Sequence, residues 1–242
     1  MFYYYGRKKQ IVKHYPHPNY DVIIEPFAGA AAYSFHYNFE VKRIILVEKD
    51  KKVADIWKWL IHDATTDDIK SLPILKVGEK SAEFLHIVHA ATKMAFAFKR
   101  IKVTPVLARN WEISRRIFAE HINKIKHWEI ICGDYTNAPD IEATWFIDPP
   151  YRGESGMGYR HSSAMIDYHT LAAWALSRKG EIICCEGEGA DYLPFVPLVE
   201  LKGVAGKVSK EMIFYKSDRK CPTLFENRSI EMSTSDSVSI LP

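Results

Sequence analysis

The chain has 242 residues, of which 47% are hydrophobic and 26% charged, and its formal net charge is +3. This length and hydrophobic content predict one α/β domain with an insertion and a substantial core. No apolar run approaches the ~20 residues that a helix needs to cross a bilayer, which excludes a transmembrane helix. The amino terminus is aromatic and basic and lacks a signal-peptide core, so we expect a cytoplasmic location.

The first predicted unit is a strand, a tight turn and a helix. Residues 22–31 read Val-Ile-Ile-Glu-Pro-Phe-Ala-Gly-Ala-Ala, and aromatic residues at helical spacing follow as far as Tyr37. A glycine-containing turn before a helix amino terminus lets backbone amides approach a nucleotide-like ligand. The next apolar run, 44–47, ends at Glu48. In nucleotide-binding βαβ units this separation from the glycine turn places an acid for ribose hydroxyls.

A helical insertion is predicted after this unit. A helix packed on the core should cover 53–61, and the polar residues 65–68 and Pro73 then mark a break. Helical spacing resumes from Ser81 and again after Pro105. We therefore expect a small helical segment between the two halves of the sheet.

Positive charge is concentrated in this insertion. Residues 93–126 contain nine Lys or Arg against two acids, so this segment carries +7 and the remainder of the chain about −4. Such clustering is typical of a phosphate-binding surface, and also of a solvated helix face without a partner. Arg109 and Asn110 are candidates for base-edge contacts, because arginine matches guanine and asparagine matches adenine in the major groove.

The most informative motif is Asp148-Pro149-Pro150-Tyr151, which follows the apolar run 143–147. A strand that runs into two prolines must end there, because proline has no amide hydrogen and a fixed φ. The acid is therefore held at the carboxyl end of the strand, where ligands bind in open α/β sheets. A carboxylate, a proline carbonyl and an aromatic ring at that place suit an amino group on a planar ring. A stiff strand exit without a ligand is the alternative.

In their order, these motifs resemble those of the Dam-like (D12 class) DNA adenine N6-methyltransferases. The resemblance covers residues 2–60 and 130–215, and it implies a Rossmann-like α/β methyltransferase sheet with a small helical insertion for DNA recognition. Arg7 and Ala31 stand where the family has glycines. An alanine at the second position is strained if the turn needs a positive φ.

The resemblance also implies a cofactor, S-adenosylmethionine, and the residues that bind it. The segment Tyr5 to Lys8 is similar to the family's opening segment, Glu48 to its ribose-binding acid, and Asp134 to the acid that reads the cofactor's adenine. The implied set is Tyr5, Gly6, Lys8, Glu25, Pro26, Phe27, Ala28, Gly29, Glu48, Lys49, Asp134, Tyr135 and Asp148.

The implied activity is site-specific methyl transfer to the exocyclic N6 amine of adenine in DNA, with no metal. The catalytic residues are then Asp148, Pro149, Pro150 and Tyr151. The carboxylate and a proline carbonyl would hold the amine, and the tyrosine would stack on a base extruded from the duplex. The expected DNA contacts are Lys99, Arg100, Arg109, Asn110, Arg115, Arg116 and, in the loop after the motif, Tyr159.

We expect a catalytic domain formed by 1–60 and 129–226, a DNA-recognition insertion at 61–128, and a loosely ordered tail at 227–242. Three alternatives stay open. The enzyme could methylate an RNA base, it could methylate cytosine at its N4 amine, or the chain could be an inactive methyltransferase-like protein that binds DNA. The recognition sequence, a restriction partner and the oligomeric state are not predictable from these residues.

Overall fold

The structure is a computed structural model, and it describes residue 8 and residues 11–78, 103–202 and 208–219. Several expectations fall outside this part of the chain. They are the contacts of Tyr5, Gly6, Lys99 and Arg100, the helix from Ser81, and the tail 227–242.

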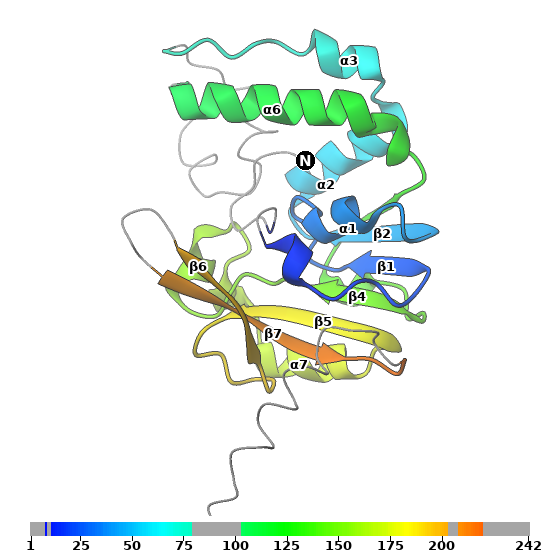
Figure 1. Ribbon diagram of the computed structural model, residues 1–242, viewed down its shortest axis with the longest axis vertical. Helices are drawn as coiled ribbons and strands as arrows, with labels where there is room; N and C mark the ends of the chain where they lie inside the picture. Colours follow the sequence, from blue (N-terminus) through cyan, green and yellow to red (C-terminus); the bar gives the residue numbers. More distant parts are fainter. Residues whose placement is uncertain (1–7, 9–10, 79–102, 203–207, 220–242) are drawn as a thin grey trace, which may run out of the picture.

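A seven-stranded sheet runs through the middle of the molecule in the order β3-β2-β1-β4-β5-β7-β6 (Figure 1). All neighbouring strands are parallel except at β7, which is antiparallel to both β5 and β6. The strands are β1 (Val22–Glu25), β2 (Arg43–Glu48), β3 (Glu129–Cys132), β4 (Ala143–Ile147), β5 (Gly180–Gly187), β6 (Val196–Lys202) and β7 (Val208–Lys216). This mixed sheet with flanking helices confirms the predicted α/β, Rossmann-like class.

The helices connect these strands, and the expected helix after Glu48 is present. The helical elements are η1 (Val12–His14), α1 (Ala32–Tyr37), α2 (Lys51–Lys58), η2 (Trp59–Asp63), α3 (Thr66–Ser71), α6 (Pro105–His121), η3 (Ile122–Lys124), η4 (Tyr135–Asn137), η5 (Glu154–Gly158), η6 (Ser163–Met165) and α7 (Tyr168–Leu176).

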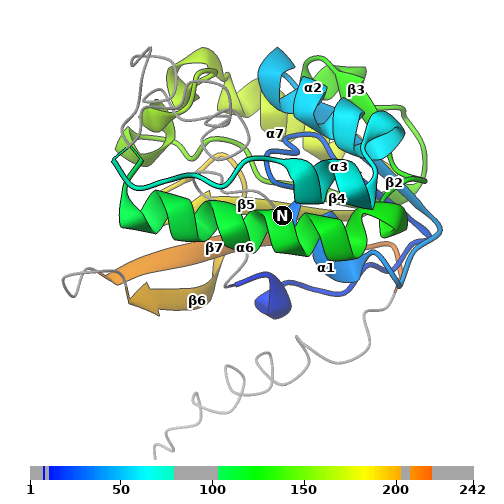
Figure 2. The same ribbon diagram turned by 90° about the horizontal axis from the view of Figure 1, so that it is seen from above.

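The core lies on both faces of the sheet, because successive side chains of a strand point to opposite sides. Ile183 and Cys185 pack with α1, α2 and α6, whereas Ile182 and Cys184 pack with α7. The adjacent cysteines therefore face opposite layers, as alternation predicts. Figure 2 shows α1 and α7 separated by the edge of the sheet.

The described part of the insertion is continuous with the main core. Ile61, Ile69, Phe118 and Ile122 belong to the same buried cluster as Leu46 of β2. Helix α6 lies next to α3, beyond the β2 side of the sheet (Figures 1 and 2). The boundary expected at residue 61 therefore does not divide the chain into two separate cores, and the division into a catalytic domain and a DNA-recognition insertion stays a prediction.

The position of the site follows from strand order. The chain passes from β1 to β2 on one side and later returns to β4 on the other, so the order reverses between β1 and β4. At such a switch point, the loops after the two strands diverge and leave a crevice outside their carboxyl ends. The glycine turn follows β1, and Asp148 follows β4.

Candidate active site

A cavity of about 300 Å³ opens at this switch point. All the described residues of the implied cofactor set border it: Lys8, Glu25, Pro26, Phe27, Ala28, Gly29, Glu48, Lys49, Asp134, Tyr135 and Asp148. They come from the carboxyl ends of four neighbouring strands and from the amino-terminal segment. The structure therefore brings together residues that are more than 100 positions apart in the sequence.

The turn after β1 contains two residues in the left-handed region. Gly29 has φ 47°, and Ala31 has φ 48° and ψ 52°. Only Ala31, among the described non-glycine residues, has a positive φ. Its methyl group is therefore held in a conformation that costs L-residues free energy, as the sequence predicts for a turn that needs glycine.

Two buried acids border the turn. The carboxylate of Glu48 accepts hydrogen bonds from the amides of Gly29 (2.9 Å) and Asp50 (2.7 Å), and burial raises its pKa to about 7. Glu25 accepts from the amide of Ser34 at 2.5 Å, and burial raises its pKa to about 8. Both carboxyl groups border the cavity and can accept or share hydrogen bonds with a ligand's hydroxyl or amino groups.

Part of the cavity wall is aromatic. The rings of Phe27 and Tyr135 are stacked with centroids 5.4 Å apart. Lys49 Nζ lies 2.8 Å from Asp134 Oδ2. Burial opposes ionisation of Asp134, but hydrogen bonds from Lys49 and Thr136 outweigh it and hold the pKa below its usual value. A planar heterocycle with an exocyclic donor would fit this combination of rings and carboxylate.

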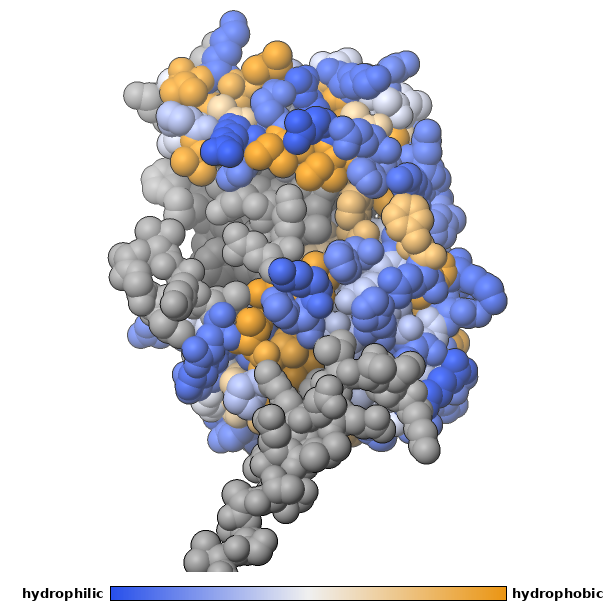
Figure 3. Space-filling model, in the orientation of Figure 1, coloured by the Kyte–Doolittle hydropathy of each residue, from blue (hydrophilic) through white to orange (hydrophobic). Residues whose placement is uncertain are grey.

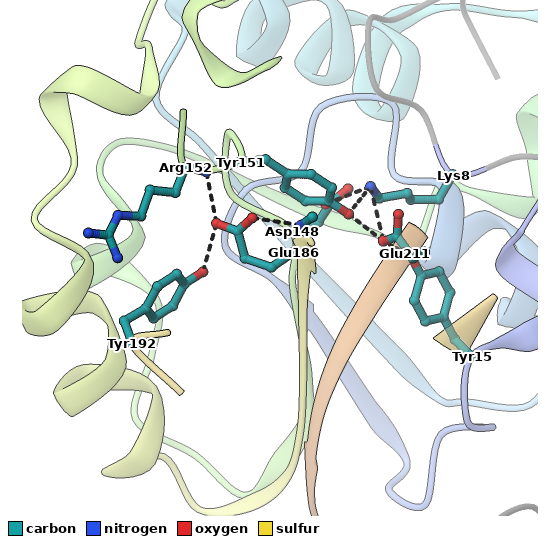
Figure 4. A network of polar contacts seen from close by, with 9 residues as sticks. Lys8, Tyr15, Asp148, Tyr151, Arg152, Glu186, Tyr192 and Glu211 are labelled. Carbon is teal, nitrogen blue, oxygen red and sulfur yellow. Dashed lines mark hydrogen bonds and ion pairs between the residues drawn. The ribbon is translucent and has the colours of Figure 1, made fainter. Parts of the chain in front are cut away.

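Asp148 is held by a buried ammonium group (Figure 4). Lys8 Nζ lies 3.2 Å from Asp148 Oδ1 and 3.3 Å from Glu211 Oε1, and it also contacts the hydroxyl of Tyr151. The Tyr151 hydroxyl in turn donates to Glu211, as does the hydroxyl of Tyr15 at 2.6 Å. Asp148 and the ring of Tyr151 are thus fixed by groups from two other parts of the chain, the amino-terminal segment and β7.

The charge of Asp148 is balanced between opposing effects. Burial raises its pKa to about 7, the positive charge of Lys8 opposes this rise, and the negative charge of Glu211 adds to it. Burial lowers the pKa of Lys8, but the two carboxylates outweigh it and raise that pKa above its usual value. Lys8 is therefore charged at neutral pH, and burial brings the pKa of Asp148 close to that pH.

The two proline carbonyls are in different states. The carbonyl of Pro150 accepts a hydrogen bond from the Tyr168 hydroxyl at 2.5 Å. Within the described residues, no hydrogen bond to the carbonyl of Pro149 is present. Pro149 thus keeps an acceptor beside Asp148, whereas Pro150 is tied to α7. Asp148 and Pro150 border the cavity, whereas Pro149 and Tyr151 are absent from its wall.

Glu186, at the end of β5, holds the start of the loop that follows the Asp148–Tyr151 motif. Its carboxylate accepts from the amides of Arg152 (2.9 Å) and Gly187 (2.7 Å) and from the hydroxyl of Tyr192 (3.2 Å; Figure 4). Glu186 is buried and is absent from the cavity wall. It supports the loop and does not present a charge to the cavity.

Sequence reasoning missed the contribution of this loop and of Asp50 to the cavity. Residues 159–161 and 165–167 border it, and Arg160 Nε lies 3.7 Å from Asp50 Oδ2. Tyr159, expected as a DNA contact, therefore borders the same cavity as Glu48 and Asp134. The loop's glycine-rich composition indicates an active-site cover, but no local pattern marks which side chains turn inward.

The expected DNA contacts on α6 divide into two groups. Arg109 and Arg116 are exposed, and Asn110 is half-buried. Arg115 instead turns inward, where its guanidinium donates to the carbonyls of Lys70 and Leu72 and pairs with Glu112. Arg115 therefore joins α6 to α3, and we leave it out of the DNA surface. Figure 3 shows hydrophilic and apolar residues side by side over α3 and α6 at the top of the molecule.

No described helix has the length and apolar character needed to cross a membrane. In the same part of the chain, no cluster of three or more metal-ligating side chains is present.

Comparisons with known proteins bear on the identity of the site. The family model of the D12 class N6 adenine-specific DNA methyltransferase matches residues 6–119, a range that includes the glycine turn, Glu48 and most of α6. A solved structure of a candidate methylase from Haemophilus influenzae is similar, with 13% identity, 82% of this chain and 88% of that chain covered, and a TM-score of 0.35. No curated protein shows significant sequence similarity.

Proposed function

We propose that the chain is a D12 class N6 adenine-specific DNA methyltransferase, that its cavity binds S-adenosylmethionine, and that Asp148 and Pro149 hold the target adenine amine beside it. The match of the D12 family model to residues 6–119 supports this proposal. The observation that carries this proposal is that the implied cofactor residues and Asp148 share one cavity at the switch point of the sheet.

The donor set of the cavity fits the cofactor. The stacked pair of Phe27 and Tyr135 next to Asp134 suits an adenine ring with its exocyclic amine. Glu48 suits the ribose hydroxyls, since one carboxylate can accept from two vicinal groups while keeping its backbone partners. The acid Glu25 and the backbone after β1 suit the amino acid end. When bound, S-adenosylmethionine supplies a methyl group on a sulfonium, whose positive charge makes it reactive.

The protein's task is then to position and activate the amine. The lone pair of adenine N6 is delocalised into the ring, which makes this nitrogen a weak nucleophile. Hydrogen bonds from the amine to the Asp148 carboxylate and the Pro149 carbonyl would favour a tetrahedral nitrogen with a localised lone pair. Positioning of this kind supplies much of the rate enhancement in reactions between two bound groups.

Asp148 also suits the removal of a proton. A nitrogen that gains a methyl group must lose one proton, and the carboxylate that accepts its hydrogen bond is the nearest base. General bases work best when their pKa lies close to the working pH, and burial brings the pKa of Asp148 to about 7. In this mechanism the proton passes from N6 to Asp148 and then to solvent.

Tyr151 would form the platform for the extruded base. Its ring is fixed at the hydroxyl end by Glu211 and Lys8, so its orientation is set before substrate arrives. Stacking on an aromatic ring offsets part of the free energy of unstacking a base from the duplex. The exposed Arg109 and Arg116 on α6 would bind phosphates of the same duplex.

The proposal is tested by separating binding from transfer. Asp148→Asn keeps the volume of the side chain but loses its charge, and we expect loss of methyl transfer with retained binding of S-adenosylhomocysteine in a calorimetric titration. Asp140→Asn is the matched control, because this acid is exposed and pairs only with Arg178 among the described residues. Near-normal turnover of Asp148→Asn would contradict the catalytic assignment.

A further inference from the structure

Glu211 is a buried acid that none of the motifs includes. It lies on β7 opposite Gly187 of β5, and only 4% of its surface is exposed. One oxygen, Oε1, accepts from the hydroxyls of Tyr15 and Tyr151 and lies 3.3 Å from Lys8 Nζ. A carboxylate is costly to bury unless several donors compensate it, and here two donors come from the amino-terminal segment and the third from Tyr151 after β4.

Lys8 is shared between the carboxylates of Glu211 and Asp148. The ammonium lies at nearly equal distances from Asp148 (3.2 Å) and Glu211 (3.3 Å), and 4.1 Å from the centroid of the Tyr151 ring. If Glu211 carried no charge, the ammonium would have only Asp148 as its charged partner within this group. It would then pair with the Asp148 carboxylate alone and compete for the oxygens that have to accept hydrogen bonds from the target amine.

We propose that Glu211 is a positioning residue of the methyl transfer site. It holds the hydroxyl of Tyr151 and shares Lys8 with Asp148, so that the ring stays fixed and the acid keeps an oxygen for the amine. This inference rests on the proposed role of Asp148.

The electrostatics of the pocket agree with this geometry. The charged groups with the largest effects on the pKa of Asp148 are Lys8 of the amino-terminal segment, Glu211 of β7 and Glu186 of β5. The charge of Asp148 in turn acts on its titratable neighbours Tyr15, Glu25, Tyr151, Cys184 and Cys185. Among the acids, Glu211 contributes most to raising the pKa of Asp148. Removing its charge should therefore lower that pKa.

The test is Glu211→Gln, which keeps the side-chain volume and an oxygen that can accept from Tyr15. Glu188→Gln is the matched control, since Glu188 is exposed and pairs with Lys210, the neighbour of Glu211 on β7. We expect the kcat for methyl transfer to DNA to fall on the order of 100-fold, as for a reacting group displaced by about 1 Å. The acidic limb of the pH profile of kcat/KM should move to lower pH. Glu211→Asp, which restores the charge, should return the limb toward its original position.

Two measurements separate this role from a structural one. Binding of S-adenosylhomocysteine and the free energy of unfolding of Glu211→Gln should match those of the control. A fall in kcat without a shift of the acidic limb, or no fall in kcat, would overturn the inference. If Glu211→Gln does not fold, Tyr151→Phe decides, because it removes only the hydroxyl that Glu211 holds. An unchanged kcat in that variant would equally overturn the inference.

The outcomes also separate this inference from the proposed function. Wild-type protein without transfer activity, or an active Asp148→Asn, would contradict the proposed function itself. An active wild type, an inactive Asp148→Asn and a Glu211→Gln that behaves like its control would leave the function standing and remove only the role of Glu211.

Discussion

Ala31 offers a direct test of the strain in the cofactor turn. Its φ of 48° and ψ of 52° place it in the left-handed region, where an L-residue is disfavoured by roughly 1–2 kcal/mol. Glycine adopts the same conformation without this cost. Ala31→Gly therefore removes strain from the folded state.

The substitution also loses stability in two ways. The methyl group of Ala31 is buried, with 1% exposed, and burial of one such group is worth about 0.8 kcal/mol. Glycine also increases the entropy of the unfolded chain, which costs about 0.4–1 kcal/mol. These losses together roughly equal the strain that is removed. We expect Ala31→Gly to leave the free energy of unfolding nearly unchanged.

Ala30→Gly is the matched control. Ala30 is also buried, with 4% exposed, and its φ is not positive. It suffers the same two losses without relief of strain, so it should lose about 1–2 kcal/mol. Urea unfolding of the two variants should therefore differ by about 1–2 kcal/mol in favour of Ala31→Gly. Equal destabilisation of the two variants would refute the argument that Ala31 is strained.

Two further predictions concern DNA binding and pH. Replacing both Arg109 and Arg116 by alanine should weaken DNA binding. It should also lower the slope of log affinity against log salt by about one for each lost phosphate contact, whereas Lys179→Ala, at an exposed residue directly before β5, should leave the slope unchanged. A slope for the double variant equal to that of Lys179→Ala would contradict the proposed surface. Burial raises the pKa of Glu25 from 4.5 to about 8, so its protonated form is favoured in the folded state and stability should fall as pH rises through this window. Glu25→Gln should flatten this fall in urea unfolding at several pH values, relative to the exposed-site control Glu40→Gln, and an unchanged slope would contradict the burial argument.

The sequence predicted the parts of the site that depend on local patterns. Strand ends, the glycine turn and the two prolines are visible in short stretches, and the positions of Glu48, Asp134 and Asp148 follow from parallel strands that end at one edge. The strain at Ala31 was foreseeable for the same reason, because a tight turn imposes its φ on whichever residue occupies it.

The contacts that complete the site depend on long-range packing. Glu211 lies on an antiparallel strand without a motif, and its three partners are 60 or more residues away in the sequence. The inward turn of Arg115 depends on carbonyls at the end of α3, so its basic character alone predicted an exposed residue. A periodic pattern identifies a helix face, but not which neighbouring element covers it.

The identity of the methylated nucleoside tests the central claim most directly. Wild-type protein would be incubated with labelled S-adenosylmethionine and unmethylated duplex DNA, and the digested nucleosides would be separated, with Asp148→Ala as the control. The account predicts label in N6-methyladenine that is absent from the control. Label in N4-methylcytosine, label in RNA but not in DNA under parallel conditions, or no label beside intact cofactor binding would contradict it.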